Sequence, residues 1–218
     1  MKKKTSFLLI VCCILMLTAI AGYATGLKNN QKNLPIYENT SVYPAFSLPQ
    51  LTDTATFIVE AEVVDVGDTI MKEITVSLTE NLEDATESLS YPVTPITLAI
   101  HSSIKGDNTG NKLIYYEEGG ITSEYVQLPD GYVMEEGMEA ILFLNPDGYC
   151  WGVQSIFPIS GENVILNNAA IEYIGKDNVS VLETQTLDSN IKSQIDAKSI
   201  NVMPADDFIS VIQSIVEN

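Results

Sequence analysis

Segment 56–66, TFIVEAEVVDV, alternates apolar and polar side chains and constrains the fold of this 218-residue chain more than any other stretch. Successive side chains of a β-strand point to opposite faces, so this period of two predicts a strand with one buried face. The predicted buried face carries Phe57, Val59, Ala61 and Val63, and the opposite face carries Glu60 and Glu62.

Further segments of strand character follow, separated by turns rich in Gly, Asp and Asn. They are residues 70–78, 94–104, 112–118, 139–144 and 149–157, with shorter ones at 163–166, 170–174 and 179–182. Because a Gly67-Asp68 turn joins them, segments 56–66 and 70–78 are predicted to pair as an antiparallel hairpin. Residues 81–90 are predicted as an exposed loop. Residues 119–131 form a long loop, of a length typical of functional or mobile segments.

Helical patterns are fewer than strand patterns. Residues 47–53 predict one short helical turn, and residues 188–198 predict a weak helix. The C-terminal segment is clearer: Pro204 suits a first helical turn, and Asp206 and Asp207 complement the helix dipole. Its apolar residues share one face, which is predicted to pack on the sheet, with partner or membrane binding as the alternative. They are Phe208, Ile209, Val211, Ile212, Ile215 and Val216.

This order of elements predicts a mainly β fold. Several antiparallel strands with a terminal helix favour a small OB-like barrel or sandwich carrying a C-terminal amphipathic helix. Residues 47–218 are interpreted as one such domain, and residues 25–46 as a linker or lead-in.

Residues 1–24 have the layout of a secretory signal peptide. Three lysines precede an apolar run from Phe7 to Ala21, and small residues place cleavage after Ala21 or Ala24. A retained N-terminal membrane anchor is the alternative, and a lipoprotein fits less well because Cys12 and Cys13 lie inside the apolar run. Each alternative predicts an extracytoplasmic domain, either secreted or anchored, whose membrane contact is limited to this segment.

The chain is strongly acidic, with a formal net charge of −18. Removal of the leader would leave 8 lysines, no arginine and 29 acidic residues, a formal charge of −21. Binding to nucleic acid depends on clustered Lys or Arg, so nucleic acid is not expected as a partner. No Ca²⁺-binding loop of the EF-hand kind is present, and the acidity is interpreted as favouring solubility.

No set of catalytic residues stands out. The only histidine, His101, lies mid-strand and is interpreted as structural. One histidine and Cys150 cannot supply the usual zinc ligands, so no metal and no cofactor are predicted. Cys150 and Trp151 are predicted to point to opposite faces of a strand, with Trp151 in the core and Cys150 either under a covering segment or at the edge. The alternative to a non-enzymatic protein is a hydrolase that uses carboxylates or Cys150.

Aromatic residues are the remaining candidates for a site. Tyrosines gather in the later strands and the 119–131 loop, and aromatic rings with polar tips suit peptide or sugar surfaces. The candidate binding residues are Tyr116, Tyr125, Tyr132 and Tyr149. The predicted function is therefore an extracytoplasmic binding or interaction module for an unknown protein, peptide or glycan.

Four short motifs also carry a family resemblance: VEAEV at 59–63, IKG at 104–106, EGMEAILFL at 136–144 and DFI at 207–209. Over about residues 50–217 the chain resembles a group of uncharacterised extracytoplasmic bacterial proteins. Their OB-like barrel is similar to that of tissue inhibitors of metalloproteinases and netrin modules. The resemblance implies that fold, and by fold analogy alone an envelope protease inhibitor. The eukaryotic inhibitors act through a disulfide-held N-terminal cysteine, which the chain lacks after leader removal.

Overall fold

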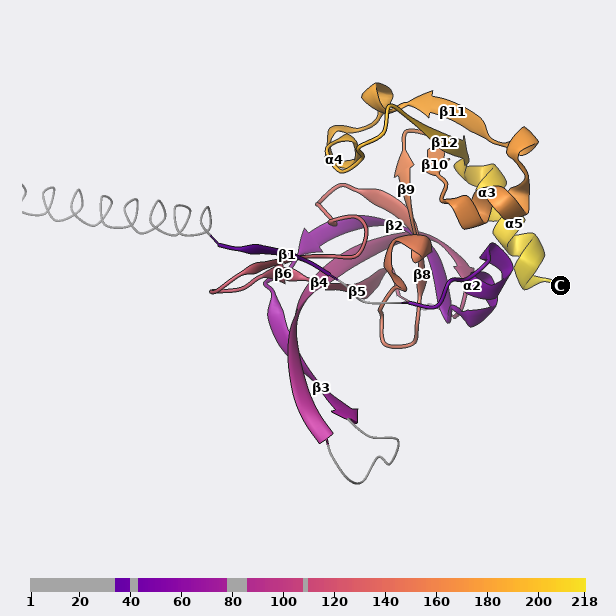
Figure 1. The fold of residues 1–218 in the computed structure, drawn as a ribbon. Helices are drawn as coiled ribbons and strands as arrows, with labels where there is room; N and C mark the ends of the chain where they lie inside the picture. Colours follow the sequence, from indigo (N-terminus) through magenta and orange to yellow (C-terminus); the bar gives the residue numbers. More distant parts are fainter. Residues whose placement is uncertain (1–33, 40–42, 78–85, 108–109) are drawn as a thin grey trace, which may run out of the picture.

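The computed structural model describes residues 34–39, 43–77, 86–107 and 110–218 (Figure 1). The predicted signal peptide or anchor, residues 1–24, lies outside the described residues, as do parts of the 25–46 lead-in and of the 81–90 loop. Among the helices that are described, none is long and apolar enough to cross a membrane.

One nine-stranded antiparallel sheet dominates the molecule, which confirms the mainly β prediction. Eight strands follow one another across it, and the ninth, β5, pairs with β4. In spatial order they are β11 (Ser180–Glu183), β12 (Ser199–Pro204), β10 (Asn163–Ile165), β9 (Ile156–Ser160), β8 (Glu139–Leu144), β2 (Phe57–Val66), β4 (Thr86–Lys105) and β3 (Ile70–Ser77), with β5 (Lys112–Glu118) beside β4. Within the described residues no pairing joins β11 to β3 or β5, so the sheet is open rather than a closed barrel.

A second, three-stranded sheet uses segments that were predicted as lead-in and loop. Its strands are β1 (Ile36–Glu38), β7 (Val126–Leu128) and β6 (Gly120–Ile121), with β1 parallel to β7. The 119–131 segment is therefore partly ordered as strands, and β7 pairs with a part of the chain 90 residues earlier.

The predicted hairpin between segments 56–66 and 70–78 is wrong. β3 pairs with β4 over Ile70↔Val93 to Ser77↔Thr86, whereas β2 pairs with β4 and β8. The cause is the length of β4, which has 20 residues. Its first part, 86–93, pairs with β3 and includes residues 86–90 of the predicted 81–90 loop. Its later part pairs with β2.

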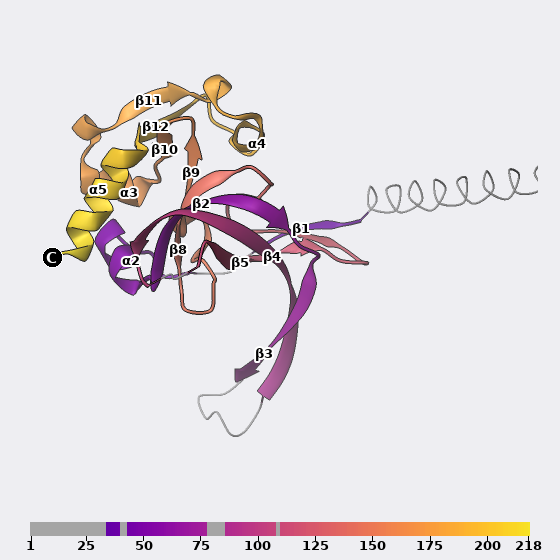
Figure 2. The same cartoon turned by 180° about the vertical axis from the view of Figure 1, so that it is seen from behind.

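Together β3 and residues 86–93 of β4 form a two-stranded projection, here called the arm, which extends away from the rest of the fold (Figures 1 and 2).

Three other local predictions are corrected. Residues 149–155 do not form a strand: a 3-10 helix, η1 (Gly152–Ser155), precedes β9, because Gly152 has a positive φ of 64° that breaks the extended backbone. Residues 170–174 are helical in α3 (Asn168–Ile174), whose first turn is capped by the Asn167 side chain. The predicted 188–198 helix is limited to α4 (Ser189–Lys192). The remaining 3-10 turns are η2 (Lys176–Asn178) and η3 (Thr184–Thr186).

Buried side chains form two clusters, one on each face of the sheet. Neighbouring residues of β2 alternate between them: Ile58 lies in one cluster and Val59 in the other. The Ile58 side is covered by α2 (Leu48–Thr54), α3 and α5 (Ala205–Val216) (Figure 2). This face is here called the helix side. The predicted short helix at 47–53 is confirmed as α2, which begins with a capping box between Ser47 and Gln50.

The C-terminal helix packs as predicted. Phe208 and Ile212 of α5 are fully buried against the helix side of the sheet, and the Phe208 ring centroid lies 4.9 Å from that of Phe157. Asp206 and Asp207 lie in its first turn, where their charges complement the helix dipole.

Candidate functional site

The structure brings together two of the four tyrosines that the sequence singled out. The rings of Tyr116 and Tyr149 stack with centroids 5.4 Å apart. Tyr125 instead contacts Tyr37 edge-on beside the small sheet, and Tyr132 packs against the core cluster on the face opposite the helix side. The four residues therefore do not form one surface, and only the Tyr116–Tyr149 pair remains as a candidate site.

Two residues of the arm complete this pair. The Lys72 ammonium lies 3.8 Å from the Tyr116 ring centroid and 5.1 Å from that of Tyr149, within the range of cation–π attraction. Tyr91 lies opposite Lys72 in the β3–β4 register and shares a hydrogen bond with Tyr149. Burial, and next this hydrogen bond, raise the pKa of Tyr91 to about 12. These four residues are here called the aromatic cluster.

Further along the arm, apolar side chains lie next to the aromatic cluster. Ile74 lies directly opposite Leu89, and each is 46% exposed. Ile74 is two residues from Lys72 and Leu89 is two residues from Tyr91, so all four side chains share one face of the arm. One face of the arm therefore carries the exposed pair Ile74 and Leu89, and the half-buried aromatic cluster lies where the arm meets the rest of the fold.

Cys150 is buried, which agrees with the covered one of its two predicted placements. It lies in the cluster opposite the helix side, whereas Trp151 packs against the helix-side cluster, with its ring edge-on to Phe46, so the two residues point apart. Burial raises the pKa of the Cys150 thiol far above its usual value. A thiol acts as a nucleophile through its thiolate, so this environment works against a reactive cysteine.

A very small cavity beside Cys150 is lined by tyrosines and two acidic side chains. Glu118 and Asp130 line it together with Tyr43, and its volume is about 10 Å³. Tyr43 donates a 2.6 Å hydrogen bond to Glu118, and burial, with the nearby Glu118 charge, raises the pKa of Asp130. A volume of this size accommodates one water molecule and no substrate.

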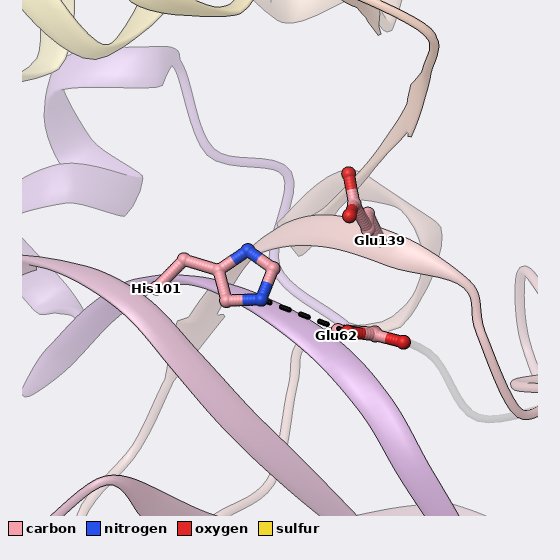
Figure 3. Close-up of side chains that lie close together, drawn as sticks. All are labelled: Glu62, His101 and Glu139. Atoms are coloured by element: carbon pink, nitrogen blue, oxygen red, sulfur yellow. Dashed lines mark ion pairs between the residues drawn. The ribbon is translucent and has the colours of Figure 1, made fainter.

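A second group of side chains comes from three neighbouring strands, β8, β2 and β4, on the helix side of the sheet (Figure 3). It lies at a part of this face that the helices do not cover. Glu62 of β2 lies directly opposite Glu139 of β8, and His101 of β4 approaches from the other side of β2. His101 Nε2 is 3.7 Å from a Glu62 carboxylate oxygen, and one ligand atom from each residue lies within 4.8 Å of the others. This set, Glu62, His101 and Glu139, is here called the His–Glu cluster.

No local pattern in the sequence reveals the His–Glu cluster, because its members are far apart in the chain. Each lies in or at the end of a correctly predicted strand, 56–66, 94–104 or 139–144, but the strand order that makes them neighbours is set by tertiary pairing. Alternation did predict that Glu62 faces away from the Val59 cluster, and that was the one available signal.

No family model matches the chain, and no curated protein matches it. The resemblance to extracytoplasmic OB-like proteins therefore stays a prediction.

Proposed function

We propose that the chain is an extracytoplasmic, non-enzymatic binding module that holds a partner protein against the arm and the aromatic cluster at its base. The observation that carries the proposal is the exposed Ile74–Leu89 pair on a projecting two-stranded arm. An isolated hairpin is marginally stable, and gathered apolar side chains on a surface mark interaction sites. A partner that covers this face would stabilise the hairpin and would also shield its apolar side chains from water.

The chemistry of this face favours a protein over a glycan. The Tyr116 and Tyr149 rings stack on each other beneath Lys72, so their faces are already engaged. The most exposed part of the face is aliphatic, at Ile74 and Leu89. Apolar side chains beside tyrosines are typical of the centre of a protein–protein interface.

Buried Cys150 gives little support to the hydrolase alternative. The leader-like pattern of residues 1–24 is what supports an extracytoplasmic location.

Site-specific crosslinking tests the proposal. A photo-crosslinking amino acid is placed at Leu89 of the full-length chain, and at Val181 as a control, because Val181 is 70% exposed on the distant strand β11. In the organism's own envelope fraction, position 89 is expected to crosslink one defined partner protein and position 181 is not.

A matched pair of substitutions sharpens the test. Ile74→Lys is expected to weaken partner binding by about tenfold or more, since a charge would be buried in an apolar contact, whereas Val181→Lys leaves binding unchanged. Equal crosslinking from both positions, or crosslinks formed only to a second copy of this chain, would contradict the proposal.

A further inference from the structure

We propose that the His–Glu cluster is a binding site for one divalent transition-metal ion of the Zn²⁺ class. The inference does not depend on the arm or on its partner, because the cluster lies on a different part of the sheet. It rests on the backbone that positions the three side chains, on the distances between their ligand atoms, and on the chemistry of that ligand set.

The backbone places two like charges against each other. Glu62 and Glu139 are direct cross-strand partners in the β2–β8 ladder, and both side chains are half-buried. Carboxylates directly opposite each other on one sheet face repel, and this arrangement destabilises the pair unless a positive charge lies between them. His101, the only histidine in the chain, places a ligand atom within 4.8 Å of those of both glutamates, from the other side of β2.

A local irregularity of β4 positions His101. The β2–β4 pairing passes from Glu60↔Ser102 to Ala61↔Ile100, so His101 is left without a partner residue in β2, as in a β-bulge. Bulges redirect a side chain and are concentrated beside functional sites. The imidazole thereby approaches Glu62 from the side of β2 opposite Glu139 (Figure 3).

The distances suit a shared cation. Ligand atoms that each lie about 2 Å from a tetrahedral metal ion are separated from one another by about 3 to 3.5 Å. The His101 Nε2 to Glu62 oxygen distance is already 3.7 Å, and all three ligand atoms lie within 4.8 Å of one another. The proposal requires the two glutamate side chains to rotate so that the remaining distances shorten.

The ligand types select the class of metal. Ca²⁺ and Mg²⁺ prefer shells made of oxygen, whereas one imidazole nitrogen with two carboxylates suits Zn²⁺ and its transition-metal neighbours. The side chains of His101 and Glu62 are 41% and 40% exposed, so further positions on the ion stay open to water. Glu139 also lines a groove whose walls include Glu135, Glu136 and Asp188. The negative charges of these three residues attract cations towards the site.

The plain alternative is an ion pair between a protonated His101 and Glu62. Such a pair, at this degree of exposure, accounts for two of the three residues but gives no role to Glu139. The two explanations differ in one measurable respect, because only the metal site binds Zn²⁺ through all three side chains at once.

Nuclear magnetic resonance of the imidazole group tests the proposal on the full-length chain held in mild detergent. The chain has one histidine, so the imidazole signals report on this cluster alone, and Zn²⁺ bound by Cys12 or Cys13 would leave them unchanged. Titration with ZnCl₂ is expected to shift the Nε2 resonance of His101 in a saturable way, with one ion per chain. MgCl₂ at the same concentrations is expected to leave it in place.

Matched variants identify the ligands. Glu62→Gln and Glu139→Gln keep the side-chain shape and are each expected to weaken Zn²⁺ binding by about tenfold or more, since even loss of an outer-shell group costs that much. Glu60→Gln removes the same charge one pleat along the same face and leaves the affinity unchanged. An unsaturable shift, an equal response to Mg²⁺, or an affinity unaltered by Glu139→Gln would overturn the proposal.

Discussion

Glu117 shows how strongly burial changes a single residue. Its side chain is 4% exposed and accepts a 2.8 Å hydrogen bond from the backbone N–H of Met134. Burial raises the pKa of this carboxyl to about 7, and the Met134 hydrogen bond opposes the shift only in part. Glu117 therefore binds its proton in the folded protein at pH values where an unfolded chain has lost it.

This shift predicts a pH-dependent stability. Since the folded pKa of Glu117 lies above the unfolded value of 4.5, its contribution is fully present below pH 4.5 and is lost as the pH rises through about 7. The loss in free energy of unfolding amounts to at most roughly 3 kcal/mol. Glu117→Gln keeps a neutral acceptor for Met134, so this part of the pH dependence should disappear.

Denaturant titrations at pH 5, 6, 7 and 8 measure the effect. Wild type is expected to lose stability relative to Glu117→Gln over this range, whereas the exposed control Glu124→Gln should follow the wild-type profile. Parallel profiles for wild type and Glu117→Gln would contradict the prediction.

At the scale of elements, local periodicity found those segments whose surroundings are regular. Segments 56–66, 112–118 and 139–144 correspond to β2, β5 and β8, and the apolar stripe of the last helix corresponds to α5. β2, β5 and α5 bury one face, which appears in the sequence as a regular apolar spacing. β8 buries both faces, which appears as a continuous apolar run.

Other elements carry no such repeat. Residues 86–90 of β4 are mostly polar, and the side chains at 88–90 are exposed. No one-sided apolar pattern marks this part of the strand, and it was therefore predicted as part of a loop. α3 has only seven residues, too few to distinguish helical from strand periodicity. The His–Glu cluster and the Lys72 contact with Tyr116 depend on strand order, which no local pattern encodes.

The packing of α5 leads to a prediction at this scale. Phe208→Ala removes a fully buried ring that contacts Phe157 and is expected to lower the free energy of unfolding by about 3 to 5 kcal/mol. Val216→Ala, at a position 41% exposed on the same helix, should change it by less than about 0.5 kcal/mol. Chemical denaturation of both variants provides the measurement. A change in the free energy of unfolding well below this range for Phe208→Ala would contradict the packing role of α5. It would instead favour a helix whose apolar face binds a partner.

At the scale of the whole molecule, one sheet separates two hydrophobic cores. Ile58 and Val59 of β2, and likewise Ile141 and Leu142 of β8, face opposite clusters, so each core shares its backbone with the other. Loss of the β2–β8 ladder would expose both faces at once. The two cores are therefore expected to unfold together, as one cooperative unit.

Two adjacent residues make this testable. Trp151 is the only tryptophan and packs on the helix-side cluster, whereas Cys150 is buried in the other. Across a denaturant series, Trp151 fluorescence and alkylation of Cys150, followed by mass spectrometry of its peptide, should give the same midpoint, because each probe reports loss of its own core. Separate midpoints, or rapid alkylation of Cys150 in native buffer, would mean that one core opens while the other stays folded.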